Sequence, residues 1–314
     1  MPDPREIFER VADAPVVPAG LPLVVLLTGF TDAGGAVSGA IDHIRDDLRP
    51  RAIAVFSNDV LLDYRARRPI VTFDKDHLSD FQPPRLELSL AHDALGQPFL
   101  LLSGYEPDFL WEGFAEAVFD FAVEFEASGL TWVHAISMPV PHTRDLGVTV
   151  SGNRPDLVEA QSIWKPRTQV PATAGHLLEY RSAEAGMLVA GFVLLIPHYL
   201  AETDYPAATI AVFDRIASAT GRVFDLDGLR EDNREYLGKV EEQIAGNDEL
   251  GRMVSGLEER YDSYMAGLSG GGSPSTSGLI HESDLPSADE LAAELERYLA
   301  SRPSGDDDKP LGGV

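Results

Sequence analysis

The chain alternates between short apolar runs with the length of β-strands and longer stretches with helical periodicity. Apolar residues recur at the spacing of one helix face in 34–48, 109–125, 173–185 and 205–221. Residues 85–102 contain two strand-like runs separated by a turn at 94–96, which predicts an antiparallel hairpin. The pattern predicts an α/β layered domain with a mixed sheet and flanking helices. The strand-like runs are 23–27, 52–56, 85–91, 98–104, 130–137 and 187–196.

The pattern changes after Gly221, and we expect the α/β core domain to span 1–222. Two apolar stripes separated by "AGND" predict a helical hairpin over 223–266, with a glycine stop and an Asn or Asp cap between the helices. The Gly- and Ser-rich segment 267–286 has the composition of a flexible linker. An amphipathic helix is predicted over 287–301, followed by a disordered acidic tail over 302–314.

Composition excludes several classes of function. The 314 residues carry 25 basic and 51 acidic side chains, a net charge of −26. Nucleic acids and anionic membranes attract positive surfaces, so we expect neither as a partner. The chain has no cysteine for disulfides or thiolate metal sites, and its histidines lack the spacing of a metal pair. The longest apolar runs are too short to cross a bilayer and the first residues are charged, so we expect a cytoplasmic protein without metal or cofactor.

Four polar segments marked by Gly or Pro follow four of the predicted strands. They are "TGFTDAGG", "SGYEPDFLW", "SMPVPHTRD" and "IPHYLAETDYP". In open α/β sheets, ligands bind outside the carboxyl ends of the strands, so we expect these segments to surround one crevice. Its candidate residues are Gly29, Thr31, Asp32, Gly34, Gly35, Glu106, Asp108, His142, Thr143, Arg144, His198 and Tyr199. The candidates for catalysis are His142, Asp32 and Glu106.

The first of these segments contains only the beginning of a phosphate-binding loop. Gly29 and Gly34 have the required spacing, but Gly35 and Ala36 stand where a lysine and a serine or threonine are needed. The glycines either shape the rim of a crevice or permit an unusual backbone and close helix packing. Asp32 is either a ligand-binding carboxylate or a carboxylate at the N-terminus of the following helix, where the helix dipole favours it.

The other segments also have structural alternatives to a functional role. Pro107 and Asp108 have the pattern of a helix start, with proline at the first helical position. Prolines constrain the loop that carries His142 and Arg144, and this arginine either acts in a site or pairs with the aspartate that follows it or another carboxylate. His198 either hydrogen-bonds locally or faces the crevice. No G-x-S-x-G elbow of a hydrolase follows any of the predicted strands.

In this order, the four segments resemble those of the PAC2 family, which is named for proteasome assembly chaperone 2. The matching motifs are "GFTDAGGA", "LLSGYEPDFLW", "PVPHTR" and "PHYLAETDYPAA", and the resemblance is closest to bacterial members, from about residue 20 to about residue 265. It implies a three-layer α/β fold similar to nucleoside phosphorylases and peptidyl hydrolases, and a homo-oligomer, often a trimer. The eukaryotic and archaeal relatives bind proteasome subunits without catalysis, whereas the resemblance implies no established activity for the bacterial branch.

Two functional hypotheses follow from these observations. The first is a non-catalytic, oligomeric protein-binding factor, similar to a proteasome assembly chaperone, whose acidic C-terminal helices contact a partner. The second is a small-molecule-binding protein, or an enzyme of hydrolase or phosphorylase type, that uses the strand-end crevice. In the second case Asp32 and Glu106 supply carboxylates, His142 acts as general acid or base, and Arg144 holds an anion.

Overall fold

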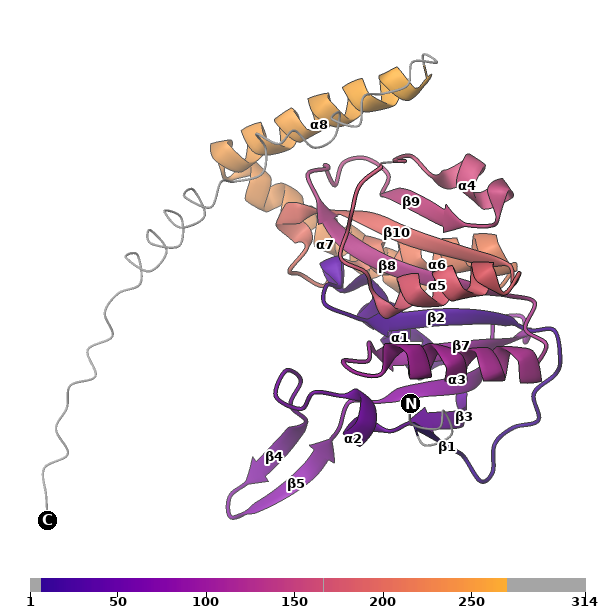
Figure 1. Ribbon diagram of the computed structural model, residues 1–314. Helices are drawn as coiled ribbons and strands as arrows, with labels where there is room; N and C mark the ends of the chain where they lie inside the picture. Colours follow the sequence, from indigo (N-terminus) through magenta and orange to yellow (C-terminus); the bar gives the residue numbers. More distant parts are fainter. Residues whose placement is uncertain (1–6, 166, 270–314) are drawn as a thin grey trace, which may run out of the picture. The chain divides into compact units, whose positions relative to one another are not determined.

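The computed structural model describes residues 7–165 and 167–269. The chain divides into two compact units, Met1–Glu259 and Arg260–Val314, and the elements below belong to the first, apart from the end of α8 after Glu259. The spatial order of its main sheet is β1-β3-β6-β7-β2-β8-β10-β9, and β4 and β5 form a separate pair (Figure 1). The strands are β1 (Phe8–Arg10), β2 (Pro22–Thr28), β3 (Arg51–Phe56), β4 (Ile70–Asp74), β5 (His77–Gln82), β6 (Leu86–His92), β7 (Pro98–Tyr105), β8 (Gly129–Met138), β9 (Gly147–Gly152) and β10 (Val189–Pro197).

The middle of the sheet is parallel and its two sides are antiparallel. Strands β7, β2, β8 and β10 are neighbours and run in the same direction. Antiparallel pairing adds β6, β3 and β1 on one side and β9 on the other. The β6–β7 pair is the predicted hairpin, and all six predicted strands are confirmed. The predicted α/β fold with a mixed sheet is therefore correct.

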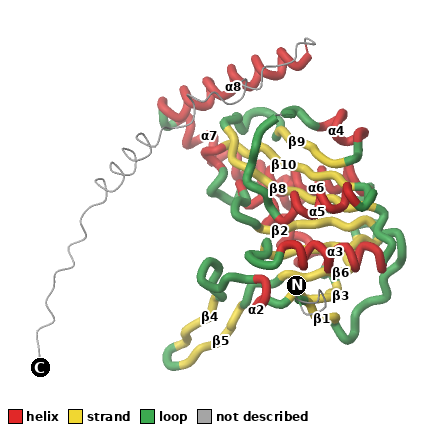
Figure 2. Tube along the Cα trace, in the orientation of Figure 1, coloured by secondary structure: helices red, strands yellow, loops and turns green. Residues whose placement is uncertain are grey.

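Helices cover both faces of the sheet (Figures 1 and 2). Helices α1 and α6 pack on one face, and their buried residues belong to one hydrophobic cluster. Helices α3 and α5 pack on the other face, and their buried residues belong to a second cluster. The helices are η2 (Ala33–Gly35), α1 (Ala36–His43), the π-helical turn η3 (Ile44–Leu48), α2 (Asn58–Leu61), α3 (Trp111–Glu124), α4 (Pro155–Gln161), α5 (Ala174–Glu184), η4 (His198–Leu200), α6 (Pro206–Thr220), α7 (Asp227–Ala245) and α8 (Asp248–Ser269).

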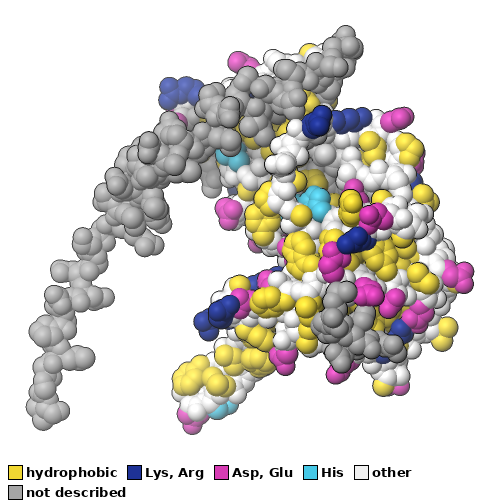
Figure 3. Space-filling model, viewed as in Figure 1, with side chains coloured by type: hydrophobic (Ala, Val, Ile, Leu, Met, Phe, Trp, Pro, Cys, Tyr) yellow, Lys and Arg dark blue, Asp and Glu magenta, His cyan; other side chains and the backbone are white. Residues whose placement is uncertain are grey.

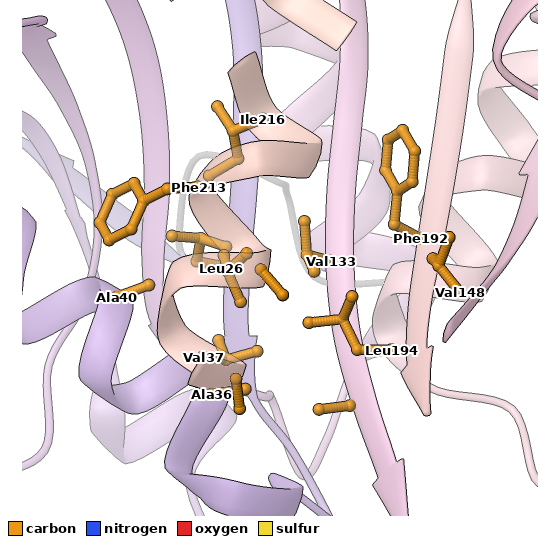
Figure 4. Packing of buried hydrophobic residues seen from close by; sticks show 14 of the residues in the cluster. Leu26, Ala36, Val37, Ala40, Val133, Val148, Phe192, Leu194, Phe213 and Ile216 are labelled. Carbon is orange, nitrogen blue, oxygen red and sulfur yellow. The ribbon is translucent and has the colours of Figure 1, made fainter. Parts of the chain in front are cut away.

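Strand β2 shows how one apolar run supplies both cores. Successive side chains of a strand point to opposite faces, so a strand covered on both sides is apolar throughout. Leu26 belongs to the cluster of α1 and α6, where Phe213 lies nearby (Figure 4). Val25 belongs to the cluster of α3 and α5, together with Phe114. This double burial explains why "LVVLL" has no polar alternation.

One predicted helix start is wrong. The pattern at Pro107 and Asp108 predicts a helix from that point, but α3 begins at Trp111, after Leu110 at a positive φ of 55°. A carboxylate oxygen of Asp108 instead accepts a hydrogen bond from the backbone N–H of Asp63 at 2.6 Å. This tertiary contact fixes the loop before the helix in a non-helical conformation.

The predicted helices after Gly221 are present as α7 and α8. Asn247 stands between them, and its side-chain oxygen accepts a hydrogen bond from the N–H of Glu249 at 3.0 Å, as expected of a cap. Helix α8 includes 267–269, the first positions of the segment expected as a linker. The remaining linker, the amphipathic helix over 287–301 and the tail over 302–314 lie outside the described residues. Within the described residues, no helix has both the length and the apolar character needed to cross a membrane.

Candidate functional site

The four polar segments gather at one edge of the sheet. They follow β2, β7, β8 and β10, which are adjacent and parallel, so their carboxyl ends lie along the same edge. Contacts join the segments directly. The N–H of Glu106, after β7, donates to the carbonyl of Thr28, at the end of β2, at 3.0 Å. The N–H of Gly34 donates to the carbonyl of Ala201, after β10, at 2.7 Å.

Asp32 holds the start of helix α1. Its two carboxylate oxygens accept hydrogen bonds from the backbone N–H groups of Val37, at 2.8 Å, and Ser38, at 2.9 Å. These N–H groups belong to the first turn of the helix, which has no partners of its own for them and carries the positive end of the dipole. The structural alternative for Asp32 therefore describes its observed contacts, and both oxygens are already engaged.

The two glycines after Asp32 allow the turn into α1 to pack closely. Gly34 and Gly35 have positive φ values of 69° and 57°. A Cβ on Gly34 would lie 3.2 Å from side-chain atoms of Ala208 and Ile196, which leaves no free space. The glycines thus satisfy a backbone and packing requirement between the β2–α1 turn and the start of α6.

Glu106 connects three elements at the strand ends. Its side chain is buried, and Oε1 accepts a hydrogen bond from the N–H of Ala174, in the first turn of α5, at 2.5 Å. A Cβ on Gly29 would lie 2.6 Å from Oε2, so glycine is required there for the carboxylate to fit. Burial raises the pKa of Glu106, and hydrogen bonds from the backbone of Ala174 and Phe30 oppose that rise.

A small pocket lies beside Glu106 at the carboxyl edge. Its volume is about 10 Å³, which is the space of about one water molecule. His134 lies in its wall, and burial lowers the pKa of this histidine to about 4, so it is neutral at pH 7. The pocket therefore has two titratable groups but no room for a substrate. Its lining residues are Val25, Leu27, Gly29, Glu106, Trp132, Val133, His134, Thr173 and Gly175.

His142 belongs to a second cluster, formed by the loop after β8 and the turn after β10. The hydroxyl of Tyr199 lies 2.6 Å from Nδ1 of His142 and accepts a hydrogen bond from its backbone N–H at 2.8 Å. Burial lowers the pKa of His142, and the carboxylates of Glu241 and Glu258 oppose this effect. A neutral ring whose Nδ1 accepts the tyrosine proton fits both observations. Helix α8 also reaches this cluster, because Glu258 pairs with Arg144 at 3.3 Å and accepts from Thr143.

The candidate residues share an edge but do not line one pocket. Of the twelve, the pocket beside Glu106 contains only Gly29 and Glu106. His198 is exposed, with its ring against that of Tyr199 at a centroid distance of 5.4 Å, and Thr31 is half-buried beside Asp32. Asp108 pairs with Arg67, a residue of the segment between α2 and β4. Among the described residues, no group of three or more His, Cys, Asp or Glu side chains has the geometry of a metal site.

Sequence reasoning missed two features of this edge. His134 lies within a strand rather than after one, so it is outside the four polar segments that predict the site. Its signal is a titratable residue within a largely buried strand, two positions from Trp132 and therefore on the same face. Thr173 lies in a stretch whose pattern predicts only a helix, yet its hydroxyl caps α5 and places the helix N-terminus at Glu106.

These observations define an α/β protein with polar loops gathered at the carboxyl edge of a mixed sheet. At this edge the carboxylates of Asp32 and Glu106 accept hydrogen bonds from backbone N–H groups and do not line an open crevice. The PAC2 family model matches residues 26–244, and the chain belongs to the PAC2 family. A comparison with curated proteins finds no significant match.

Several solved structures are similar to this chain, three of them as follows. A protein of unknown function from Corynebacterium glutamicum is 35% identical, with a TM-score of 0.80, over 82% of this chain and 98% of that one. A protein of unknown function from Mycobacterium tuberculosis is 36% identical, with a TM-score of 0.79, over 86% of this chain and 92% of that one. A proteasome-assembly chaperone homologue from M. tuberculosis is 21% identical, with a TM-score of 0.67, over 74% of this chain and 100% of that one, and this likeness concerns the fold alone.

Proposed function

We propose that this chain is a non-catalytic protein-binding factor that works as a homo-oligomer and acts in the manner of a proteasome assembly chaperone. The observation that carries the proposal is the chemistry of the carboxyl edge. Glu106 and Asp32 bind backbone N–H groups, His142 binds Tyr199, and the adjacent pocket has a volume of only about 10 Å³. Groups engaged in this way hold loops in position rather than act on a substrate. The shared fold of the M. tuberculosis chaperone homologue supports the same class.

Apolar side chains at this edge support a protein partner. Phe30 is 72% exposed and directly follows the glycine that accommodates Glu106. Phe109 and Leu110, in the loop after β7, are also exposed. Large apolar groups on loops that a rigid network holds in place are typical of protein-binding surfaces, because their burial against a partner is favourable.

A binding experiment tests this surface. The full-length protein, immobilised at native salt, should retain proteasome subunits from its own source, and the double variant Phe30→Ser with Phe109→Ser should lose that retention. Val123→Ser is the matched control, because Val123 is equally exposed but lies in α3, away from these loops. Recovery of the protein alone, or equal retention by the double variant, would contradict the proposal.

The β4–β5 hairpin supports self-association. It pairs with no other strand within the described residues, and hydrophobic side chains gather over it at the lower left of the space-filling view (Figure 3). Phe73 and Leu78 face each other across the two strands at 70% and 65% exposure, and Phe81 is 65% exposed. A lone two-stranded hairpin is marginally stable in water, so such side chains favour a second copy as cover.

The mass of the particle tests self-association. Light scattering after gel filtration should give a multiple of 34.1 kDa for the native chain and a smaller particle for Phe73→Ser with Phe81→Ser. Leu95→Ser is the control, because Leu95 is a similarly exposed apolar residue in the β6–β7 turn. A monomeric native chain, or an unchanged mass in the double variant, would contradict this part of the proposal.

A small-molecule or enzymatic function is the second candidate, and one observation favours it. Glu106 and His134, two buried groups with shifted pKa values, lie together at the carboxyl edge of parallel strands, where catalytic sites are often found. Thermal-shift screening with nucleosides, phosphates and peptides tests it, since a ligand of the folded state raises the melting temperature. A stabilising ligand whose effect disappears in Glu106→Gln would favour this candidate over the first.

A further inference from the structure

A second, larger pocket lies at the opposite edge of the sheet. It is built from the amino ends of β2, β8 and β10, the start of α4 and the end of α6, and we call it the amino-edge pocket. Its volume is about 190 Å³, compared with about 10 Å³ for the pocket beside Glu106. That volume is below the roughly 300–1,000 Å³ of sites for drug-sized ligands, and it leaves room for a small anion. Its lining residues are Gly20, Pro22, Ser128, Gly129, Leu130, Thr131, Arg154, Leu188, Val189, Ala190, Ala219, Thr220 and Arg222.

Two arginines lie in the wall of this pocket, each held by one side of its guanidinium. Arg154 donates through Nε and Nη2 to Asp156 at 3.0 and 2.7 Å, and its Nη1 has only a long contact of 3.5 Å with the carbonyl of Ala219. Arg222 donates through Nε and Nη2 to the carbonyl of Pro98 at 3.2 and 2.9 Å. Each guanidinium is therefore fixed in orientation while Nη donors stay available. A cation held in this way loses little conformational entropy when it binds an anion.

The wall also contains a threonine from the middle of the sheet. Thr131 is 5% exposed and lines the pocket. A threonine hydroxyl at a cavity wall can donate a hydrogen bond to a molecule inside. Thr131 is on β8, at the centre of the parallel strands, and is independent of both arginines.

The charge of the pocket wall is opposite to that of the chain as a whole. The chain has a net charge of −26, yet none of the described residues that line the pocket is acidic. Each arginine already has an acidic neighbour: Asp156 binds Arg154, and the buried Asp93, which accepts backbone N–H groups of Leu95, Gln97 and Val223, interacts electrostatically with Arg222. The pocket wall itself adds no further carboxylate to compete for the remaining donors.

We propose that the amino-edge pocket binds a small oxyanion, a carboxylate or a phosphate monoester, through Arg154, Arg222 and the hydroxyl of Thr131. Guanidinium groups bind both kinds of anion through charge-assisted hydrogen bonds, and a hydroxyl adds a neutral donor. This site is separate from the carboxyl edge and does not depend on the function proposed there.

Titration calorimetry of the full-length protein tests the proposal, with inorganic phosphate and malonate as separate probes at constant ionic strength. We expect saturable binding of at least one probe, and the probe that binds more tightly identifies the preferred anion. Arg154→Gln and Arg222→Gln should each raise the Kd about tenfold, because each removes a charge-assisted hydrogen bond. Thr131→Val should raise it roughly threefold, because it removes a neutral hydrogen-bond donor.

Arg181→Gln is the control, because Arg181 is an exposed arginine that also binds two carboxylates, those of Glu112 and Glu184, outside the pocket. Its Kd should equal that of the native protein. If Arg222→Gln fails to fold, Thr131→Val and Arg154→Gln still decide the question. The proposal is wrong if neither probe binds saturably, or if these two variants bind as the native protein does.

Discussion

Removal of the Asp32 carboxylate should lower the stability of the folded protein, because this carboxylate holds the start of helix α1. Its oxygens accept two hydrogen bonds from the first turn of α1, from the N–H groups of Val37 and Ser38. Loss of a capping side chain costs about 1 kcal/mol on average and up to about 2, and loss of a charge at a helix N-terminus costs a further 0.3 to roughly 1 kcal/mol. We therefore expect Asp32→Ala to lower the free energy of unfolding by about 2 kcal/mol. Asp32→Asn, which keeps one acceptor, should lower it by about 1 kcal/mol.

Thermal and urea unfolding of the full chain measure these changes. For a domain of this size, a loss of about 2 kcal/mol lowers the melting temperature by about 4–8 °C. Asp47→Ala is the control, since Asp47 is an exposed aspartate in the same helical segment that pairs only with His43 in the described structure, at 3.3 Å. A loss of stability in Asp32→Ala no larger than that of the control would refute the capping role and return Asp32 to the ligand candidates.

Three further substitutions test other parts of the fold. The pKa of His134 is lowered to about 4 in the folded state, so between pH 6.5 and 4 the unfolded chain binds a proton that the folded chain does not. The free energy of unfolding should therefore fall by about 3 kcal/mol as the pH drops from 6.5 to 4. His134→Gln should flatten this part of the pH profile of urea unfolding. Gly104→Ala should destabilise by about 3 kcal/mol in the same assay, because φ is +139° and the new Cβ would lie 2.0 Å from the carbonyl oxygen of Arg85. Tyr199→Phe should cost about 2 kcal/mol, because the N–H and Nδ1 of His142 lose their shared partner.

Each of these changes has a control and a contradicting result. For His134, an equally steep loss of stability in acid in the variant would show that other groups titrate instead; His77, an exposed histidine, supplies the control His77→Gln. For Gly104, the control is Gly96→Ala, where φ is also positive but nothing lies within 4 Å of the new Cβ. Equal losses at the two glycines would rule out the backbone clash. For Tyr199, unchanged stability would show that solvent replaces the hydroxyl without cost.

The central strands could be predicted from the sequence because their burial on both faces leaves an unbroken apolar run. The polar segments that follow these strands also indicated the carboxyl edge correctly, because neighbouring parallel strands end at the same edge of a sheet. The β4–β5 hairpin was not predicted. A register shift between Ile70 and Thr72 interrupts its alternation, and its apolar side chains point to solvent, so it lacks the period of a half-buried strand.

The details of the edge could not be predicted, because they depend on contacts between residues far apart in the chain. Glu106 meets Ala174, Asp108 meets Arg67 and His142 meets Tyr199, and no local pattern at any of them encodes these partners. The expected single crevice requires side chains that point into a common space. The folded chain instead directs Asp32 to its own helix and Glu106 to the opposite face of the sheet.

The position of β2 has a consequence for biosynthesis. This strand is made early, but its two neighbours end at Tyr105 and Met138, so β2 has no completed sheet until roughly 110 more residues have been translated. At about 5–20 residues per second, this interval lasts roughly 5–20 seconds. Throughout it, "LVVLL" is an apolar segment without its final partners on the nascent chain. The speed of the ribosome through residues 29–138 therefore determines how long this segment is open to aggregation.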